Sequence, residues 1–146
     1  MKLDSLYQEV ILDHYKHPQN KGLSEDFTAQ VSHVNISCGD EITLNIRLTG
    51  DLISALRWDG QGCSISQASV SMLTDLLTGK TLEEAAVIVK SFSDLMASKG
   101  TSPGDPSILE DAVVFAGVSK FPGRVKCALL GWMAFKDVAI QAQGKK

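Results

Sequence analysis

The sequence predicts an α+β fold in which a three-stranded antiparallel sheet packs against about five helices. Two observations lead to this prediction. Between residues 27 and 59, apolar residues alternate with polar ones at a period of two, as they do in strands. Before residue 18 and after residue 63, apolar residues recur at helical spacing instead. Strands that come together and are followed by helices are typical of a sheet with its helices on one face.

The first helix is predicted over residues 4–17, where apolar side chains share one face, and Pro18 ends it. In the strand region, the alternation is most regular around Asn45, which it assigns to the polar face of the sheet. Short turns such as residues 50–51 join the strands into a meander. The three strands are predicted over residues 27–37, 41–49 and 52–59.

Four more helices are predicted after Cys63. A capping box, formed by Thr81 and Glu84, opens the second of them. Residues 98–106 contain two prolines and two glycines, so they are expected to form a surface loop. A break at residues 121–123 separates the last two helices. The four ranges are 64–78, 81–96, 107–118 and 124–141.

Composition limits the possible functions. The chain has 146 residues, 44% of them hydrophobic, which is enough to bury the core of a single domain spanning residues 1–146. The net charge of −3 argues against nucleic acid or an anionic membrane as a partner. No apolar run reaches the roughly 18 residues of a membrane span, and the N-terminus has no signal-peptide core. Three cysteines cannot all pair within the chain, so a reducing, cytoplasmic location is expected.

The three cysteines lie at the ends of predicted elements rather than inside apolar stripes. Cys38 follows the first strand beside Gly39, and Cys63 immediately precedes a helix. Cys127 is expected in the first turn of the last helix. The N-terminus of a helix favours negative charge and lowers the pKa of a thiol there. Thiols at element ends can converge in space although they are far apart in the sequence.

Asp40 supplies a possible fourth donor beside these thiols. The glycine between Cys38 and Asp40 lets the backbone turn so that the thiolate and the carboxylate point at one centre. Three sulfur donors and one oxygen donor would suit tetrahedral Zn²⁺. The spacing also allows an alternative, in which the thiols are unrelated buried groups and Asp40 caps the turn. The sequence contains no local pair of cysteines that would decide between the two.

Other polar residues near the cysteines are weaker candidates. Arg124 can lower the pKa of the Cys127 thiol or attract an anionic sulfur, and it can equally be a solvated cation. Lys126 is expected to be solvated. The three histidines are expected to have structural roles, because none lies in a cluster of metal ligands in the sequence. They are His14, His17 and His33.

Four ordered segments resemble the sequence signatures of the IscU/NifU-N/SufU superfamily of iron–sulfur assembly proteins. Together with the residues between them, they cover the chain from about Leu6 to Phe135. The segments are residues 13–22 (DHYKHPQNKG), 38–40 (CGD), 60–66 (GQGCSIS) and 124–127 (RVKC).

Three departures from scaffold-type members resemble the SufU branch. Lys126 stands where scaffolds carry a histidine, and residues 121–125 (FPGRV) replace their Leu-Pro-Pro-Val-Lys chaperone motif. The segment between Cys63 and Cys127 is also longer. The resemblance implies a SufE/NifU-like fold and a zinc-dependent sulfurtransferase activity. Its implied partners are a SufS-type cysteine desulfurase, which supplies sulfur, and a downstream cluster-assembly scaffold. The ligand positions that it implies are Cys38, Asp40, Cys63 and Cys127.

Cys38 is the expected sulfur acceptor because it lies on a glycine-flanked loop, whereas the other two cysteines are anchored at helix ends. Two further hypotheses use the same residues. In one, the chain is a scaffold that binds iron and assembles a [2Fe–2S] cluster, since such clusters also take thiolate ligands. In the other, zinc has only a structural role and its removal unfolds the protein.

Overall fold

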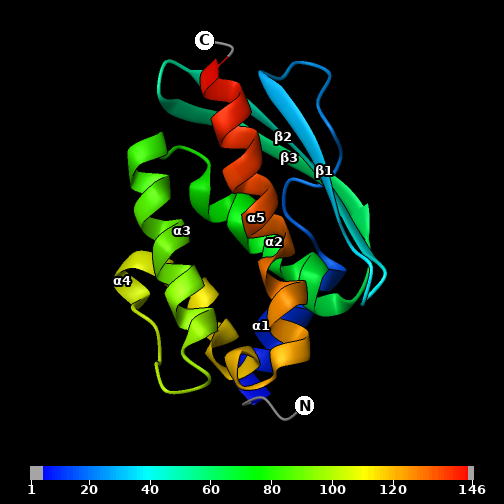
Figure 1. Cartoon of the computed structure of the whole chain (residues 1–146), viewed down its shortest axis with the longest axis vertical. Helices are drawn as coiled ribbons and strands as arrows, with labels where there is room; N and C mark the ends of the chain where they lie inside the picture. Colours follow the sequence, from blue (N-terminus) through cyan, green and yellow to red (C-terminus); the bar gives the residue numbers. More distant parts are fainter. Residues whose placement is uncertain (1–4, 145–146) are drawn as a thin grey trace.

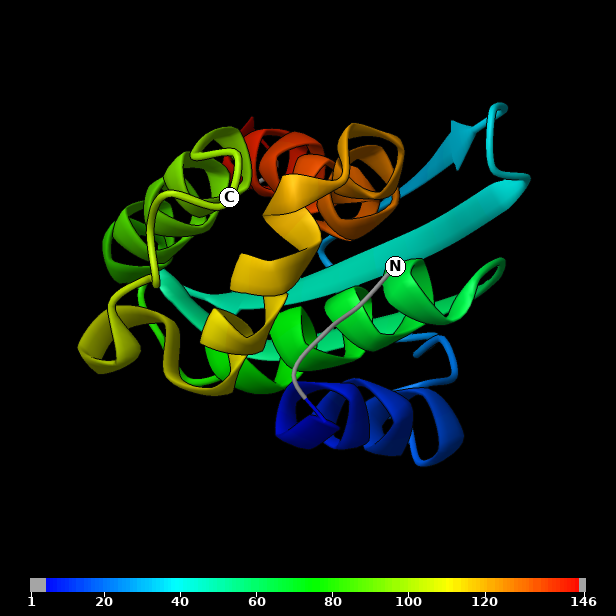
Figure 2. The same ribbon diagram turned by 90° about the horizontal axis from the view of Figure 1, so that it is seen from below.

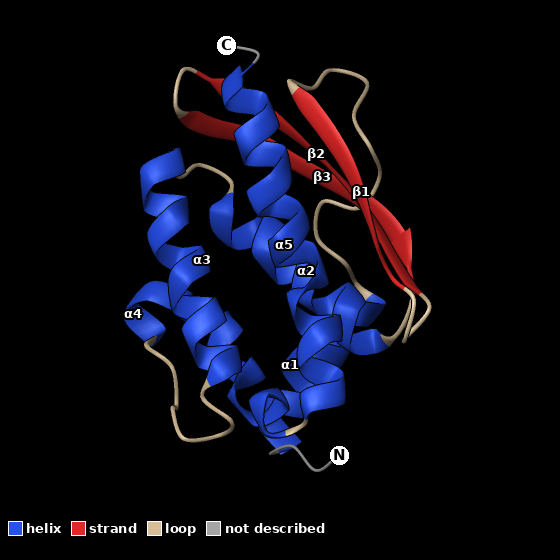
Figure 3. Cartoon of the chain, in the orientation of Figure 1, coloured by secondary structure: helices blue, strands red, loops and turns tan. Residues whose placement is uncertain are grey.

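The computed structural model describes residues 5–144 and confirms the α+β fold. Within these residues it contains a three-stranded antiparallel sheet, five α-helices and one 3₁₀ helix, η1 (Figures 1 and 3). The helices are α1 (Ser5–Lys16), α2 (Ser64–Leu77), α3 (Leu82–Ala97), α4 (Pro106–Leu109), η1 (Glu110–Lys120) and α5 (Pro122–Gly144). The strands are β1 (Ala29–Asn35), β2 (Asp40–Thr49) and β3 (Leu52–Gln61). Residue 4, which was predicted to begin the first helix, lies outside the described residues.

The sheet has the strand order β1-β2-β3, and its inner face is covered by helices. Helix α5 packs against β1 and β2, and α2 packs against β3. Helix α2 lies between α1 and α5 (Figure 2). The outer face carries exposed polar residues such as Gln30, Ser32 and Arg47. The predicted alternation is therefore correct for most of the sheet.

Asn45 is an exception to this alternation. Its side chain is fully buried although it was assigned to the polar, solvent-facing side. The segment between α1 and β1 folds across the outer face at this point. The Asn45 amide donates to the backbone oxygen of Ser24 at 2.9 Å and to the side chain of Gln30 at 3.1 Å. A polar side chain is needed at this position because the oxygens of Ser24 and Gln30 require a hydrogen-bond donor where the segment covers the sheet.

Helix α2 is buried on nearly all sides, whereas the sequence indicated a single apolar face. Only Asp75 within the helix is exposed. The helix lies between neighbours, so its small polar residues are buried as well as its apolar ones. Thr74 and Ser71 bond the segment that follows α1, while Ser69 donates to the backbone oxygen of Ala128 in α5 at 2.6 Å. Small hydroxyl side chains allow close packing and still pair with the backbone.

The helix predicted over residues 107–118 is wrong in its type. Helix α4 begins at Pro106, after Asp105 caps it, and is interrupted at Glu110, which has a positive φ of 49°. A right-handed α-helix cannot continue through that conformation. The following residues form the 3₁₀ helix η1, in which every third side chain points the same way. Three of its five buried residues, Ala112, Phe115 and Val118, follow that period of three.

Helix α5 begins earlier than predicted, at Pro122 rather than at Arg124. Proline is favoured in the first turn of a helix, because the backbone N–H that it lacks has no partner there. Cys127 consequently lies in the second turn and not in the first, so the helix N-terminus acts on its thiol less strongly than expected. Although α5 has 23 residues, no described helix is long and apolar enough to cross a membrane.

The predicted capping box at the start of α3 is present. Thr81 accepts a hydrogen bond from the Glu84 backbone at 3.1 Å, and Glu84 accepts one from the Thr81 backbone at 2.9 Å.

Thr81→Ala is expected to lower the free energy of unfolding by about 1 kcal/mol, because it leaves a helix N–H without its cap. The bond from Thr81 also lowers the pKa of Glu84. The contribution of Glu84 is therefore present at neutral pH and is lost as the pH falls through that lowered pKa.

Urea unfolding of the wild type, Thr81→Ala and Thr49→Ala measures this effect. Thr49 is an exposed residue at the end of β2, so its replacement controls for the loss of a threonine. Equal free energies of unfolding for Thr81→Ala and Thr49→Ala at neutral pH would contradict the prediction.

Candidate metal centre

The turn between β1 and β2 carries the first thiol. Cys38 is partly exposed, and its backbone N–H donates to the carbonyl oxygen of Asn35 at 3.2 Å. The Asn35 side chain donates to Cys38 Sγ at 3.4 Å. Gly39 then takes a positive φ of 68°, which reverses the chain into β2. The turn therefore fixes the position of the thiol, which stays partly exposed to solvent.

Asp40 begins β2 and is fully buried. Its Oδ1 accepts a hydrogen bond from the backbone N–H of Cys63 at 2.8 Å. This bond needs a close approach of the two chains, which Gly62 provides. A Cβ atom on Gly62 would lie 2.1 Å from Asp40 Oδ1, and the φ of Gly62 is +146°. A side chain at this position would displace the carboxylate.

Cys63 is the N-cap of α2, but its thiol makes no capping hydrogen bond to the helix. Its Sγ instead lies 3.8 Å from Asp40 Oδ2. Asp40 thus contacts Cys63 twice, once at the backbone and once at the thiol. These contacts orient the second carboxylate oxygen and the second thiol toward the same region.

Cys127 enters the group from α5 and is fully buried. Its Sγ lies 2.7 Å from Cys38 Sγ and 3.7 Å from the carbonyl oxygen of Gly123. Burial raises the pKa of the Cys127 thiol, and the neighbouring Cys38 thiol and Asp40 carboxylate raise it further. Forming a thiolate here is therefore unfavourable unless a positive charge comes with it.

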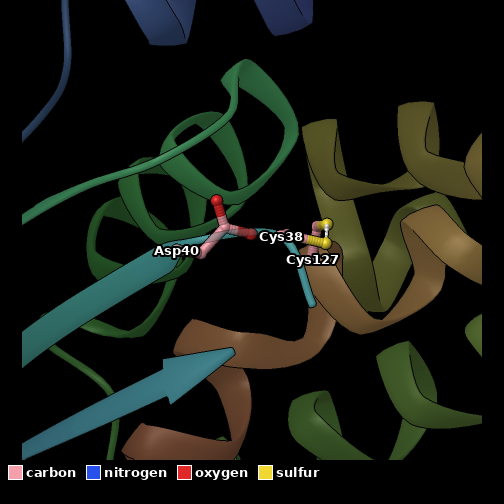
Figure 4. A group of neighbouring side chains, drawn as sticks. All are labelled: Cys38, Asp40 and Cys127. Carbon is pink, nitrogen blue, oxygen red and sulfur yellow. Dashed lines mark hydrogen bonds between the residues drawn. The ribbon is translucent and has the colours of Figure 1, made fainter. Parts of the chain in front are cut away.

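The ligand atoms of Cys38, Asp40 and Cys127 all lie within 4.8 Å of one another (Figure 4). Three of the four predicted ligands thus form one compact group, and Cys63 borders it through Asp40. The sequence brings them together from a hairpin turn, the start of a strand and two helices. Two or three sulfur donors with one carboxylate are a donor set that suits Zn²⁺, and thiolates also suit iron–sulfur clusters.

The remaining candidates lie outside this group. Arg124 and Lys126 are both exposed at the start of α5. His14 bonds the hydroxyl of Ser71 at 2.8 Å, and His33 bonds the carboxylate of Asp137 at 2.8 Å. These contacts agree with the structural roles expected of these two histidines. The third histidine, at position 17, is exposed.

Two residues of the site were not identified from the sequence. Asn35 holds the Cys38 thiol, and its position three residues before the cysteine is the spacing of a turn that closes on itself. Gly62 allows the approach of Asp40, and the signal for it is a glycine directly before a cysteine that caps a helix. The glycine signal does not identify Asp40 as the partner, because that contact depends on how the start of β2 lies beside the end of β3.

Comparison with known proteins gives concordant matches. The family model described as the NifU-like N-terminal domain matches residues 6–128. The zinc-dependent sulfurtransferase SufU of Bacillus subtilis is 44% identical over 97% of this chain and 95% of its own length. The iron–sulfur cluster assembly scaffold protein IscU of Streptococcus pyogenes is 40% identical over 93% of this chain and 84% of its own length.

A solved structure also matches this chain over most of its length. The protein, from Fervidobacterium islandicum, is described as an iron–sulfur cluster assembly scaffold for the SUF system and is 34% identical to this chain. It superposes with a TM-score of 0.83, covering 90% of this chain and 94% of its own.

Proposed function

The chain belongs to the family of NifU-like N-terminal domains, and we propose that it works in iron–sulfur cluster assembly as a zinc-dependent sulfur acceptor. Its sulfur comes from a SufS-type cysteine desulfurase and goes on to a downstream cluster-assembly scaffold in the cytoplasm. The similarity to a zinc-dependent sulfurtransferase over nearly the whole chain supports this function. The observation that carries the proposal is the compact group of Cys38, Asp40 and Cys127, with Cys63 beside it.

Zinc is held in this proposal by Cys38, Asp40, Cys63 and Cys127. When bound, it supplies the positive charge that keeps its thiol ligands deprotonated at neutral pH, without redox chemistry of its own. The buried Cys127 needs such a charge most, because burial raises the pKa of its thiol. The hydrogen bond from the Cys63 backbone orients the Asp40 carboxylate toward the same centre.

Cys38 is the sulfur acceptor, because it combines a reactive atom with access from solvent. It is partly exposed on a turn, whereas Cys127 is fully buried in α5. The Cys38 sulfur attacks the outer sulfur of a cysteine persulfide on the desulfurase. One S–S bond forms at Cys38 while the persulfide S–S bond breaks, and the desulfurase cysteine leaves as a thiol or thiolate. The transfer moves one neutral sulfur atom and needs no oxidant or reductant.

Cys38→Ala is expected to abolish sulfur transfer from a SufS-type desulfurase, because Cys127 is fully buried and the partly exposed Cys63 is held at the start of α2 with its Sγ against Asp40. The fold is expected to be unchanged, since the replaced side chain lies on a partly exposed turn. Mass spectrometry after incubation with the desulfurase and cysteine detects the added sulfur, and urea unfolding checks the fold. Ser37→Ala, at the exposed neighbouring position, is the matched control and is expected to accept sulfur normally.

Full acceptance of sulfur by Cys38→Ala would exclude Cys38 as the acceptor. Failure of the wild-type chain to accept sulfur or to stimulate any desulfurase would exclude the function as a whole and favour a structural zinc site.

A scaffold function is the second candidate, because a scaffold protein is 40% identical to this chain and the same donors suit a [2Fe–2S] cluster. Lys126 argues against it, since scaffold-type sequences carry a histidine at that position and a lysine is exposed there in this chain. Anaerobic reconstitution with iron and sulfide separates the two functions. The sulfur acceptor is expected to retain zinc and form no stable cluster, whereas a scaffold would yield a cluster that transfers to an acceptor protein.

A further inference from the structure

Ile36 has an unusual position for an apolar side chain. It is 90% exposed, more than any other large hydrophobic residue among those the structure describes. It lies on the turn between β1 and β2, two residues before Cys38. Val34, two residues earlier at the end of β1, is 59% exposed. Isolated exposed hydrophobic residues are common on protein surfaces, so the significance of Ile36 depends on its neighbourhood.

The turn that carries Ile36 also presents the Cys38 thiol. The Cys38 backbone N–H and the Asn35 carbonyl close this turn, and the Asn35 amide holds Cys38 Sγ. Ile36 lies inside the closed turn, so its backbone position is fixed relative to the thiol. Ile36 is almost wholly outside the hydrophobic core, and a polar residue would serve a hairpin turn at least as well. The fold alone therefore gives no reason for isoleucine here.

The chemistry of sulfur transfer requires a partner to cover this turn. The new S–S bond is only about 2 Å long, so the persulfide of a donor protein must come into direct contact with Cys38. Ile36 is two residues from Cys38 on the same closed turn and 90% exposed, so a protein surface that covers this turn covers Ile36 as well. Burying a fully exposed isoleucine is favourable by its apolar area.

The charges around the thiol indicate the character of that surface. The carbonyl oxygen of Gly123 lies 4.0 Å from Cys38 Sγ, so the start of α5 borders the thiol. Arg124 and Lys126 follow it, are both exposed, and form no ion pair within residues 5–144. On the opposite side of the turn, Glu41 pairs with Val34 across the hairpin. A complementary partner is therefore acidic on the side that faces α5.

We propose that Ile36 is the apolar anchor by which this chain docks onto the desulfurase. It enters an apolar pocket beside the persulfide-bearing cysteine, and acidic groups of the desulfurase face Arg124 and Lys126. This inference rests on the proposed function and adds to it the residue that determines the affinity for the partner.

The test compares Ile36→Asp with Ile140→Asp. Ile140 is 69% exposed on α5, thirteen residues beyond Cys127 and thus about 20 Å further along the helix. Desulfurase turnover is measured against the concentration of each variant, which gives a half-saturating concentration and a rate at saturation. Ile36→Asp is expected to raise the half-saturating concentration about tenfold or more with little change in the rate at saturation. Ile140→Asp is expected to behave as the wild type.

A second measurement uses cysteine persulfide, a small donor that needs no docking surface. Ile36→Asp and the wild type are expected to accept sulfur from it at the same rate. An unchanged half-saturating concentration for Ile36→Asp, or an equal increase for Ile140→Asp, overturns the inference but leaves the sulfur-acceptor function intact. A loss of reaction with cysteine persulfide overturns it too, since Ile36 would then position the thiol instead of docking. A wild type inactive with both donors refutes the proposed function itself, and the inference with it.

Discussion

Gly62→Ala is expected to weaken zinc binding by about 10- to 100-fold and to lower the free energy of unfolding by about 1–3 kcal/mol. The added Cβ atom would lie 2.1 Å from Oδ1, 2.8 Å from Cγ and 2.9 Å from Cα of Asp40. Rotating the whole Asp40 side chain about its Cα–Cβ bond relieves at most the first two contacts, because the third is to the backbone. Asp40 is fully buried, so its side chain has no solvent-filled space to enter.

The same substitution removes a hydrogen bond that orients the site. Asp40 Oδ1 accepts from the backbone N–H of Cys63 at 2.8 Å, and a displaced carboxylate leaves that N–H without a partner. The Asp40 carboxylate is expected to shift relative to the thiols, although no ligand has been replaced. Replacing Gly62 is therefore expected to weaken zinc binding as strongly as replacing a residue that hydrogen-bonds to a metal ligand.

Gly79→Ala is the control for backbone strain. Gly79 also has a positive φ, of 89°, but a Cβ atom added there meets no atom within 4 Å. Competition with a chromophoric chelator measures the zinc affinity of both variants, and urea unfolding measures their stability. Gly79→Ala is expected to be destabilised yet to bind zinc normally. Wild-type zinc affinity in Gly62→Ala would show that the carboxylate does not depend on this close approach.

The sequence predicts an element well when its pattern of apolar and polar residues is determined by packing against a single neighbour or by local contacts. The alternation in residues 41–49 reflects a strand with one covered face, and it correctly places Ile42, Leu44 and Ile46 in the core. The capping box at Thr81 depends only on residues within four positions of each other, so it too is readable from the sequence.

The errors occur where more than one neighbour acts on a segment. Helix α2 packs against α1, α5 and β3, so a single apolar stripe does not describe its burial. The interruption at Glu110 arises from a backbone conformation that the residue type does not encode. The period of three in η1 was present in the sequence, but it is close enough to a helical period to be mistaken for one.

The candidate site also has one part that the sequence predicts and one part that it does not. The four donor residues were predicted from their positions at element ends and from the family resemblance, and three of them form one group. Their burial was not predictable. Cys127 was expected in a first helical turn with a lowered thiol pKa, whereas the earlier start of α5 and its packing on the sheet bury it and raise the pKa. Long-range packing determines that difference.

Zinc is expected to raise the free energy of unfolding by about 4 kcal/mol when its free concentration is a thousand times the dissociation constant. At a fixed concentration of free zinc, this gain is expected to grow with pH. In the zinc-free chain, burial raises the pKa of Cys127, so the thiol is protonated at neutral pH. That state stabilises the zinc-free fold at and below neutral pH, and the stabilisation is lost as the pH rises above the ordinary thiol pKa. Zinc binding has the opposite dependence, because it must displace the proton.

Between pH 6 and 8, below the ordinary thiol pKa, the contribution of Cys127 to the zinc-free fold stays constant, and zinc binding alone widens the difference between the zinc-bound and zinc-free proteins as the pH rises. Thermal and urea unfolding at pH 6, 7 and 8, with zinc or with a chelator, measures this difference. Cys127→Ser keeps the size of the side chain but replaces the sulfur ligand by a hydroxyl, which zinc binds far less well. It is expected to lose most of the stabilisation by zinc and its pH dependence. A stabilisation that does not vary with pH, or that persists fully in Cys127→Ser, would mean that the buried thiol is not a zinc ligand, since a metal bound elsewhere would have no reason to displace its proton.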